Sequence, residues 1–316
     1  MGPHLRGWES GPCSVLSRRA WLALLSECDD GGRFDGIVPT VYDCAGSPRA
    51  GASRYSDVAM KLLEALGRWA LTYVAEMGRM LIFVASSFGW LARPPFRFIQ
   101  TVKQLHFIGY KSTFVVVLTA TFTGMVLALQ GYHTLRKFGS EGLLGAAVAV
   151  SMIRELGPVL AALMVTARAG SAITAEIGIM RITEQIDALD TMAVNPLQYL
   201  IAPKLVAGLV GVPLLVAIFD VVGIYGGHVV GVELLGVNAG TYWNSIESAV
   251  EWKDVYGGIL KSISFGLIIS WVCCYKGFFT KMSAEGLGNA TTEAVVLSSV
   301  LILVWDYFLT ALLFNL

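Results

Sequence analysis

Two adjacent charges, Arg154 and Glu155, lie inside an apolar stretch that runs from residue 142 to residue 167. Lys261 and Asp306 interrupt two further apolar stretches. A charge at the centre of a bilayer costs roughly 2.5–3.5 kcal/mol on insertion scales, so such side chains usually face a protein interior or a wet cavity. The guanidinium of Arg154 is suited to a phosphate, and Glu155 to an amine or to charge balance. These residue types predict binding of a charged headgroup at mid-membrane.

A purely structural interpretation stays open for the same charges. Arg154 and Glu155 could form an ion pair that locks two helices together, and Asp306 could be a polar packing residue. Lys261 lies about two turns into its stretch, where its amine could reach the interface or contact a second phosphate oxygen. For Asp220 the packing interpretation is favoured.

The sequence has no pattern typical of catalysis. There is no G-x-x-x-x-G-K-[ST], because the stretch Gly109–Thr113 lacks the glycine before its lysine, and there is no HExxH or GxSxG. The five cysteines form no CxxC pair. Lys plus Arg equals Asp plus Glu at 23 each, which gives no indication of nucleic-acid binding. We expect a non-enzymatic chain that binds no cofactor itself and that takes any energy from another subunit.

The elements that would position the charges are membrane spans. The chain is 55% hydrophobic and 15% charged, and a helix needs about 20 apolar residues to cross a core of about 30 Å. We therefore predict an all-α integral membrane protein with five transmembrane helices. The spans are expected near residues 112–135, 142–167, 205–230, 255–275 and 294–314.

The N-terminal part differs from the rest. Residues 1–55 are rich in Gly, Pro, Ser and charge and are expected to be disordered or a misannotated extension, with Met60 as a candidate true start. Residues 57–92 show apolar positions at helical spacing and predict an amphipathic helix in the interface plane. Residues 93–316 are expected to form the permease domain.

A charged segment separates the second and third predicted spans. Ile179, Ile182, Ile186, Leu189 and Ala193 follow a 3-4-3-4 spacing, which predicts one cytoplasmic helix over 170–195 with an acidic opposite face. Such a helix suits a groove in a soluble partner. Two joints are predicted beside it, a break at Gly157-Pro158 and a hinge at Ala169–Ser171. The Lys/Arg bias of the loops places this segment and the N-terminus in the cytoplasm and the C-terminus outside.

The run from Ile153 to Lys204 resembles the signature region of the MlaE (YrbE) permease family, the membrane subunit of ABC transporters that work with MCE-domain proteins. Supporting stretches are GMVLALQGY, VVGIYGGHVVG, LKSISFG and NATTEAVVLSS, in that order along the chain. The resemblance covers about residues 60–314.

The resemblance implies a homodimer in the bacterial inner membrane that moves phospholipid between that membrane and the outer envelope. The implied partners are a cytosolic ABC ATPase similar to MlaF, an MCE-domain hexamer similar to MlaD, and a STAS-domain protein similar to MlaB. No nucleic acid is implied. The implied lipid-binding residues, with Asp306 added for its place inside a span, are Arg154, Glu155, Leu156, Leu127, Gln130, Lys261 and Asp306. The implied ATPase-coupling residues are Glu176, Arg181 and Glu184, with Asp187 added for its place on the acidic face of the same segment.

Two other classes of protein also place charges inside membrane spans. A secondary transporter should show an internal repeat or paired broken helices, and neither is visible. A membrane scaffold would explain the cytoplasmic helix but would leave the charges inside the spans without a function.

Overall fold

The computed structural model describes residues 67–68, 71, 74–87 and 98–314. Those residues are almost entirely helical, and no strand occurs among them. Five helical segments are long and apolar enough to cross a membrane, which confirms the predicted all-α membrane fold. The segments are 99–136, 141–182, 197–234, 252–278 and 284–313. The predictions for residues 1–55 and for both ends of the amphipathic helix, 57–66 and 88–92, lie outside the described residues.

The first and third spans pack along each other. The first is α3 (Phe98–Arg136), and the third is centred on α8 (Ala202–His228) between two π-helical turns, Leu197–Ile201 and Val229–Leu234. A Cβ added to Gly124 of α3 would lie 1.8 Å from the carbonyl oxygen of Gly223 in α8. Small residues let membrane helices approach this closely, so glycine sets the distance between these two spans.

The second span is one continuous helical path from residue 141 to residue 182. The predicted break at Gly157-Pro158 does not occur. Pro158 lies in the first turn of α5, directly after a π-helical turn, where its missing N–H is tolerated. The predicted hinge at Ala169–Ser171 is likewise helical. The parts of this span are η1 (Glu141–Leu143), α4 (Leu144–Ser151), η2 (Met152–Leu156), α5 (Gly157–Val165), η3 (Thr166–Gly170) and α6 (Ser171–Ile182).

The segment predicted as one helix over 170–195 is two helices. α6 ends at Ile182, and α7 (Gln185–Thr191) begins after Glu184, whose φ of 56° is left-handed. A residue in this conformation interrupts the right-handed helix, and the predicted apolar seam ends there. Ile186 is buried while Ile179 is half exposed, so the seam does not form one face.

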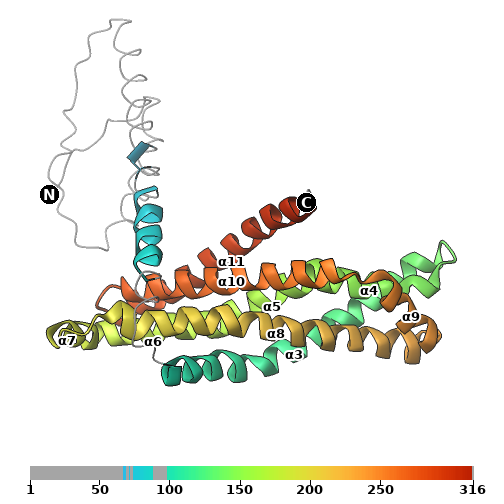
Figure 1. Ribbon diagram of the computed structural model, residues 1–316, viewed down its shortest axis with the longest axis horizontal. Helices are drawn as coiled ribbons and strands as arrows, with labels where there is room; N and C mark the ends of the chain where they lie inside the picture. The colour runs from blue at the N-terminus through green and yellow to red at the C-terminus, as the bar shows by residue number, and fades with distance from the viewer. Residues whose placement is uncertain (1–66, 69–70, 72–73, 88–97, 315–316) are drawn as a thin grey trace, which may run out of the picture. The chain divides into compact units, whose positions relative to one another are not determined.

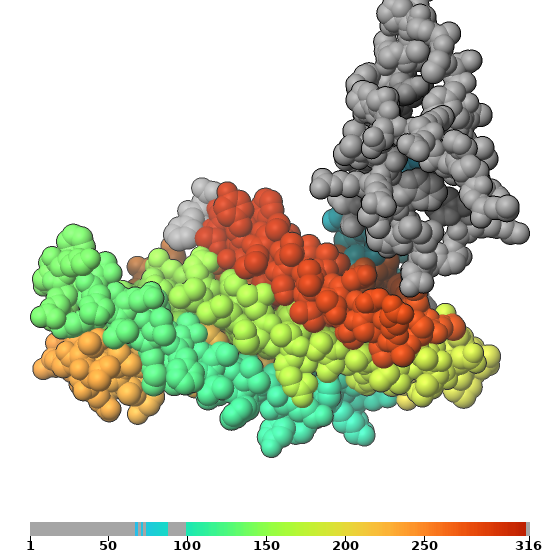
Figure 2. Space-filling model, turned by 180° about the vertical axis from the view of Figure 1, so that it is seen from behind, coloured from blue at the N-terminus to red at the C-terminus, as the bar shows by residue number. Residues whose placement is uncertain are grey.

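The C-terminal half contains α9 (Ala239–Ala249), α10 (Trp252–Phe278) and α11 (Ala284–Phe314). Figure 1 shows α10 running from α9 at one end of the bundle toward α7 at the other. In the most apolar 18-residue stretch of each helix, 61% of the stretch is buried in α10 and 11% in α11. Figure 2 shows α11 lying along the outside of the second span. α10 is therefore the central span and α11 an outer one.

Tyr242 fixes α9 against the spans. Its side chain is fully buried, and its hydroxyl donates a hydrogen bond to the carbonyl oxygen of Ile224, 3.1 Å away. Burial raises the pKa of Tyr242 to about 12, so the phenol stays protonated and keeps this donor at physiological pH.

A helix over residues 74–87 packs at the end of α10, where the sequence predicted part of an amphipathic helix. Trp271 donates its indole N–H to the carbonyl oxygen of Met80 at 2.9 Å. The ammonium of Lys276 binds Glu76 at 2.9 Å and Glu293 of α11 at 3.0 Å. One lysine therefore joins this helix to two spans.

Candidate functional site

The π-helical turn Met152–Leu156 presents Arg154 and Glu155 toward α10. Arg154 Nε donates to Asp254 Oδ1 at 2.7 Å, and Nη2 donates to Oδ2 at 3.0 Å. This is the two-bond geometry that makes an arginine–carboxylate pair strong. The Arg154 side chain is 39% exposed and the Asp254 side chain 10%. The guanidinium is therefore held from one side and accessible from another.

Lys261 is the buried centre of the cluster. Its ammonium donates to Glu155 Oε2 at 2.8 Å, Thr310 Oγ1 at 2.6 Å and the carbonyl oxygen of Arg154 at 3.0 Å. These three acceptors use its three protons, and Asp306 Oδ1 adds an ion pair at 3.1 Å. The side chain is 3% exposed. The predicted position of this amine at the interface is wrong, because three spans enclose it.

The cluster borders a pocket of about 520 Å³ between the second, fourth and fifth spans. Its lining combines charge with apolar and aromatic surface, as a site for an amphiphile requires. The lining residues are Arg154, Glu155, Glu251, Lys253, Asp254, Tyr256, Gly257, Gly258, Leu260, Lys261, Thr310 and Leu313.

The helix that carries the site is longer than the predicted span 142–167. Arg154 is 13 residues from the start of the segment 141–182, which is 42 residues long (154 − 141 = 13). Its partner Asp254 is only the third residue of α10. The mid-membrane position of Arg154 stays a prediction, because the helix continues through α6 beyond the residues needed to cross a bilayer.

Four predicted lipid-binding residues do not line this pocket. Asp306 contacts Lys261 of the cluster but does not line the pocket. Leu127 and Leu156 are partly buried against the hydrophobic core, and Gln130 is exposed near the end of α3. The structure therefore brings together Arg154, Glu155 and Lys261, with Asp306 behind them.

Sequence reasoning missed Asp254 and Thr310. Asp254 lies one residue before the predicted span 255–275, yet it is seven residues before Lys261, and residues seven apart share one helix face. That face of α10 carries an anion and a cation. Asp254 pairs with Arg154, and Lys261 pairs with the adjacent Glu155. This seven-residue spacing is the feature of the sequence that could have identified Asp254 as a site residue.

Asp220 packs against the same π-helical turn from α8. Its Oδ1 is buried and accepts no hydrogen bond from any residue that the structure describes. A Cβ added to Gly157 would lie 1.7 Å from this oxygen. The helix-packing interpretation of Asp220 agrees with this contact, and Gly157 provides the space for it.

The predicted coupling residues lie at the opposite end of the bundle and have different surroundings. Glu176 binds Lys204 at 2.6 Å, and the Lys204 side chain is fully buried. Glu176 therefore forms an ion pair inside the bundle, with 35% of its side chain still exposed. Arg181 binds Asp187 at 2.6 Å, which joins α6 to α7. Glu184, at the left-handed position between these helices, is exposed.

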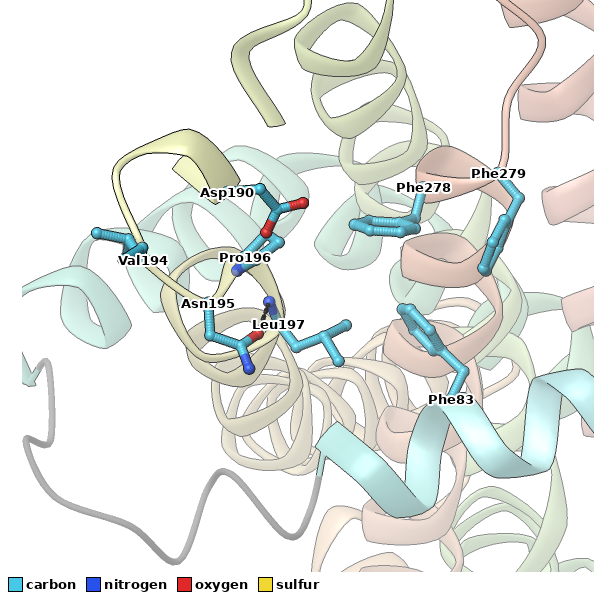
Figure 3. A pocket seen from close by; sticks show the side chains of 9 residues that line it. Phe83, Asp190, Val194, Asn195, Pro196, Leu197, Phe278 and Phe279 are labelled. Atoms are coloured by element: carbon cyan, nitrogen blue, oxygen red, sulfur yellow. Dashed lines mark hydrogen bonds between the residues drawn. The ribbon is translucent and has the colours of Figure 1, made fainter. Parts of the chain in front are cut away.

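A second pocket of about 520 Å³ lies beside α7. Figure 3 shows Phe83, Phe278 and Phe279 on one side of it and Asp190 with Asn195-Pro196 on the other. The three rings contact one another, with centroids 5.2–6.0 Å apart. This end therefore offers aromatic surface next to an acidic segment.

The five spans and the pocket define an all-α, multi-span membrane protein with an ionic pocket between three of its spans. Comparison with known proteins then gives the family. The profile described as Permease MlaE matches residues 101–312, and the chain belongs to this permease family.

Curated relatives agree over most of the chain. A probable ABC transporter permease protein of Rickettsia bellii is 43% identical over 256 residues, 81% of this chain and 99% of the relative. The intermembrane phospholipid transport system permease protein MlaE of Haemophilus influenzae is 39% identical over 259 residues, 81% of this chain and 98% of that protein. The Arabidopsis thaliana chloroplastic protein TRIGALACTOSYLDIACYLGLYCEROL 1 is 34% identical over 216 residues, 68% of this chain and 62% of that protein.

Proposed function

We propose that this chain is the membrane permease subunit of an ABC transporter that moves phospholipid between the inner membrane and the outer envelope. The observation that carries the proposal is the half-exposed guanidinium of Arg154 in a pocket between three spans. The name of the Haemophilus influenzae relative, an intermembrane phospholipid transport system permease protein, supports the same cargo. ATP and Mg²⁺ act in a separate cytosolic ATPase, and the permease itself performs no chemical step.

In this proposal Arg154 binds the headgroup phosphate, since it is the exposed cation of the cluster. Leu260 and Leu313 provide apolar lining for the acyl chains. Lys261 holds Glu155 and Thr310 in place rather than binding phosphate, because its protons are already donated. Glu155, 39% exposed, faces the same pocket and suits the amine of a zwitterionic headgroup.

The ATPase contact is assigned to the exposed part of the segment between the second and third spans. Glu184 and Asp190 are exposed there, whereas Glu176 is used internally. Asp187 is half exposed and bound to Arg181, so these two residues stabilise the segment. Glu184 is the residue of this set that a partner meets most directly.

The proposed assembly is a homodimer with an ATPase similar to MlaF, an MCE-domain hexamer similar to MlaD and a STAS-domain protein similar to MlaB. The exposed apolar surface of α11 supports contact with lipid or a second copy. The end that carries α7 is proposed to face the cytoplasm, since basic residues gather there. They are Arg168, Arg181, Lys204, Lys276 and Lys281. With five spans, the C-terminus then faces the periplasm.

Reconstitution tests the proposal. The permease is placed in proteoliposomes with its ATPase and MCE partners, and movement of labelled phospholipid is followed after ATP addition. Arg154→Ala should lower lipid movement at least about tenfold while ATPase binding persists, because the two sites lie at opposite ends. Glu184→Lys should weaken ATPase binding and leave lipid binding intact. Wild-type transport by Arg154→Ala, or equal loss of assembly in both variants, would refute this division.

A further inference from the structure

Asp254 occupies the side of Arg154 that an anionic ligand would use. Its two oxygens lie 2.7 and 3.0 Å from Nε and Nη2 of Arg154. The guanidinium binds carboxylate and phosphate through the same pair of N–H groups. A phosphate that binds in this geometry therefore competes with Asp254 for Arg154.

We propose that Asp254 is an internal anion that holds Arg154 until the phosphate of a lipid headgroup displaces it. This inference rests on the proposed lipid-transport function. It makes Asp254, which is not among the predicted site residues, a residue that sets the affinity and selectivity of the pocket for phosphate-bearing ligands.

The charges of the cluster favour such an exchange. Two cations, Arg154 and Lys261, face three carboxylates, those of Asp254, Glu155 and Asp306, which gives a formal net charge of −1 (2 − 3 = −1). The exposed Lys253 and Glu251 of the same pocket leave this balance unchanged. An added phosphate would be repelled while all three carboxylates remain in place. Lys261 cannot bind it instead, because its three protons have acceptors. Movement of Asp254 removes the nearest negative charge and frees Arg154.

The start of α10 offers the displaced carboxylate a second partner. Asp254 Oδ2 already lies 3.3 Å from the backbone N–H of Glu251, within a capping box. The N-terminus of a helix also favours negative charge. Asp254 can therefore leave Arg154 without being left unpaired in an apolar environment, which keeps the cost of the exchange low.

The test measures binding of two soluble probes to the full-length permease in detergent micelles. Dihexanoyl phosphatidylglycerol carries a phosphate, and dihexanoylglycerol does not. Asp254→Asn should lower the Kd of the phosphate probe about three- to tenfold and leave the Kd of the other unchanged. Asp254→Ser, a smaller uncharged replacement, should act in the same direction. Glu251→Gln is the matched control, because it removes a carboxylate from the same pocket without breaking a contact to Arg154.

The outcomes separate the exchange from the wider proposal. If the wild type fails to bind the phosphate probe, both the lipid function and the exchange are wrong. If the wild type binds and Arg154→Gln binds more weakly, but neither Asp254 variant binds more tightly, only the exchange is wrong. An equal gain in Glu251→Gln would also overturn it, since general charge would then explain the effect. A purely structural role for Asp254 predicts weaker binding of both probes.

Discussion

At the scale of single residues, the cluster around Lys261 is a buried arrangement of complementary charges. Each carboxylate there depends on a cation from another helix: Glu155 and Asp306 on Lys261, and Asp254 on Arg154. Loss of one member of a buried pair costs more than loss of the whole pair, because the remaining charge is left uncompensated. The loss of stability on neutralising one charge should therefore depend on whether its partner is neutralised in the same variant.

Lys261→Met should lower the stability of the permease in detergent by about 3 kcal/mol, because Glu155 and Asp306 lose their shared cation. Equilibrium unfolding in mixed micelles measures this change. The triple variant Lys261→Met, Glu155→Gln, Asp306→Asn should recover most of the loss. A triple variant less stable than Lys261→Met alone would show that the ionic arrangement itself stabilises the fold.

At the scale of helices, apolar length predicted the five spans but not their ends. Predicted spans stopped at charges such as Lys111 and Lys204, whereas the helices continue through both positions. Lys204 is tolerated because Glu176 and Gln104 bind it inside the protein. Only the folded structure brings such partners together, since Gln104 is 100 residues away from Lys204.

The sequence predicted part of the candidate site, but not the partners of its charges. Arg154 and Glu155 stood out because charge inside an apolar run is rare. Their partners did not, because Asp254 lies just outside the predicted span 255–275, and the exposure of each group depends on packing between spans. The left-handed Glu184 was also unpredictable, since few non-glycine residues adopt this conformation and the helical periodicity continues through it.

Gly124→Ala should separate α3 from α8 and destabilise the permease by about 1–3 kcal/mol, because the new methyl group would overlap the carbonyl oxygen of Gly223. Thermal unfolding in detergent measures the loss. Gly109→Ala is the matched control on the same helix, because a Cβ there meets no atom within 4 Å. Equal stability of the two variants would argue against close packing at this crossing.

At the scale of the whole molecule, the two candidate surfaces lie at opposite ends of the bundle. The ionic pocket borders the start of α10, and the aromatic pocket borders its end. Helix 74–87 joins the second end through Lys276, which bridges Glu76 and Glu293. This lysine therefore stabilises the arrangement of three elements next to the proposed ATPase contact.

Lys276→Ala should loosen helix 74–87, because one substitution removes both ion pairs. Trypsin cleavage after the exposed Arg79 should become roughly fivefold faster, as expected for a local opening with fewer contacts. Lys281→Ala, an exposed lysine at the same end, serves as the control. Unchanged cleavage in Lys276→Ala would mean that Trp271 and the phenylalanine cluster hold this helix without the ion pairs.

The burial of α10 has a mechanical consequence. At 1.5 Å per residue its 27 residues form a rod about 40 Å long, with Asp254 near one tip and Phe278 at the other. A tilt of about 8° around its centre would move each tip by about 3 Å, in opposite directions. That displacement is as long as the bonds between Arg154 and Asp254. A tilt of this size would therefore be enough to separate these two groups, and a single continuous helix joins the two pockets.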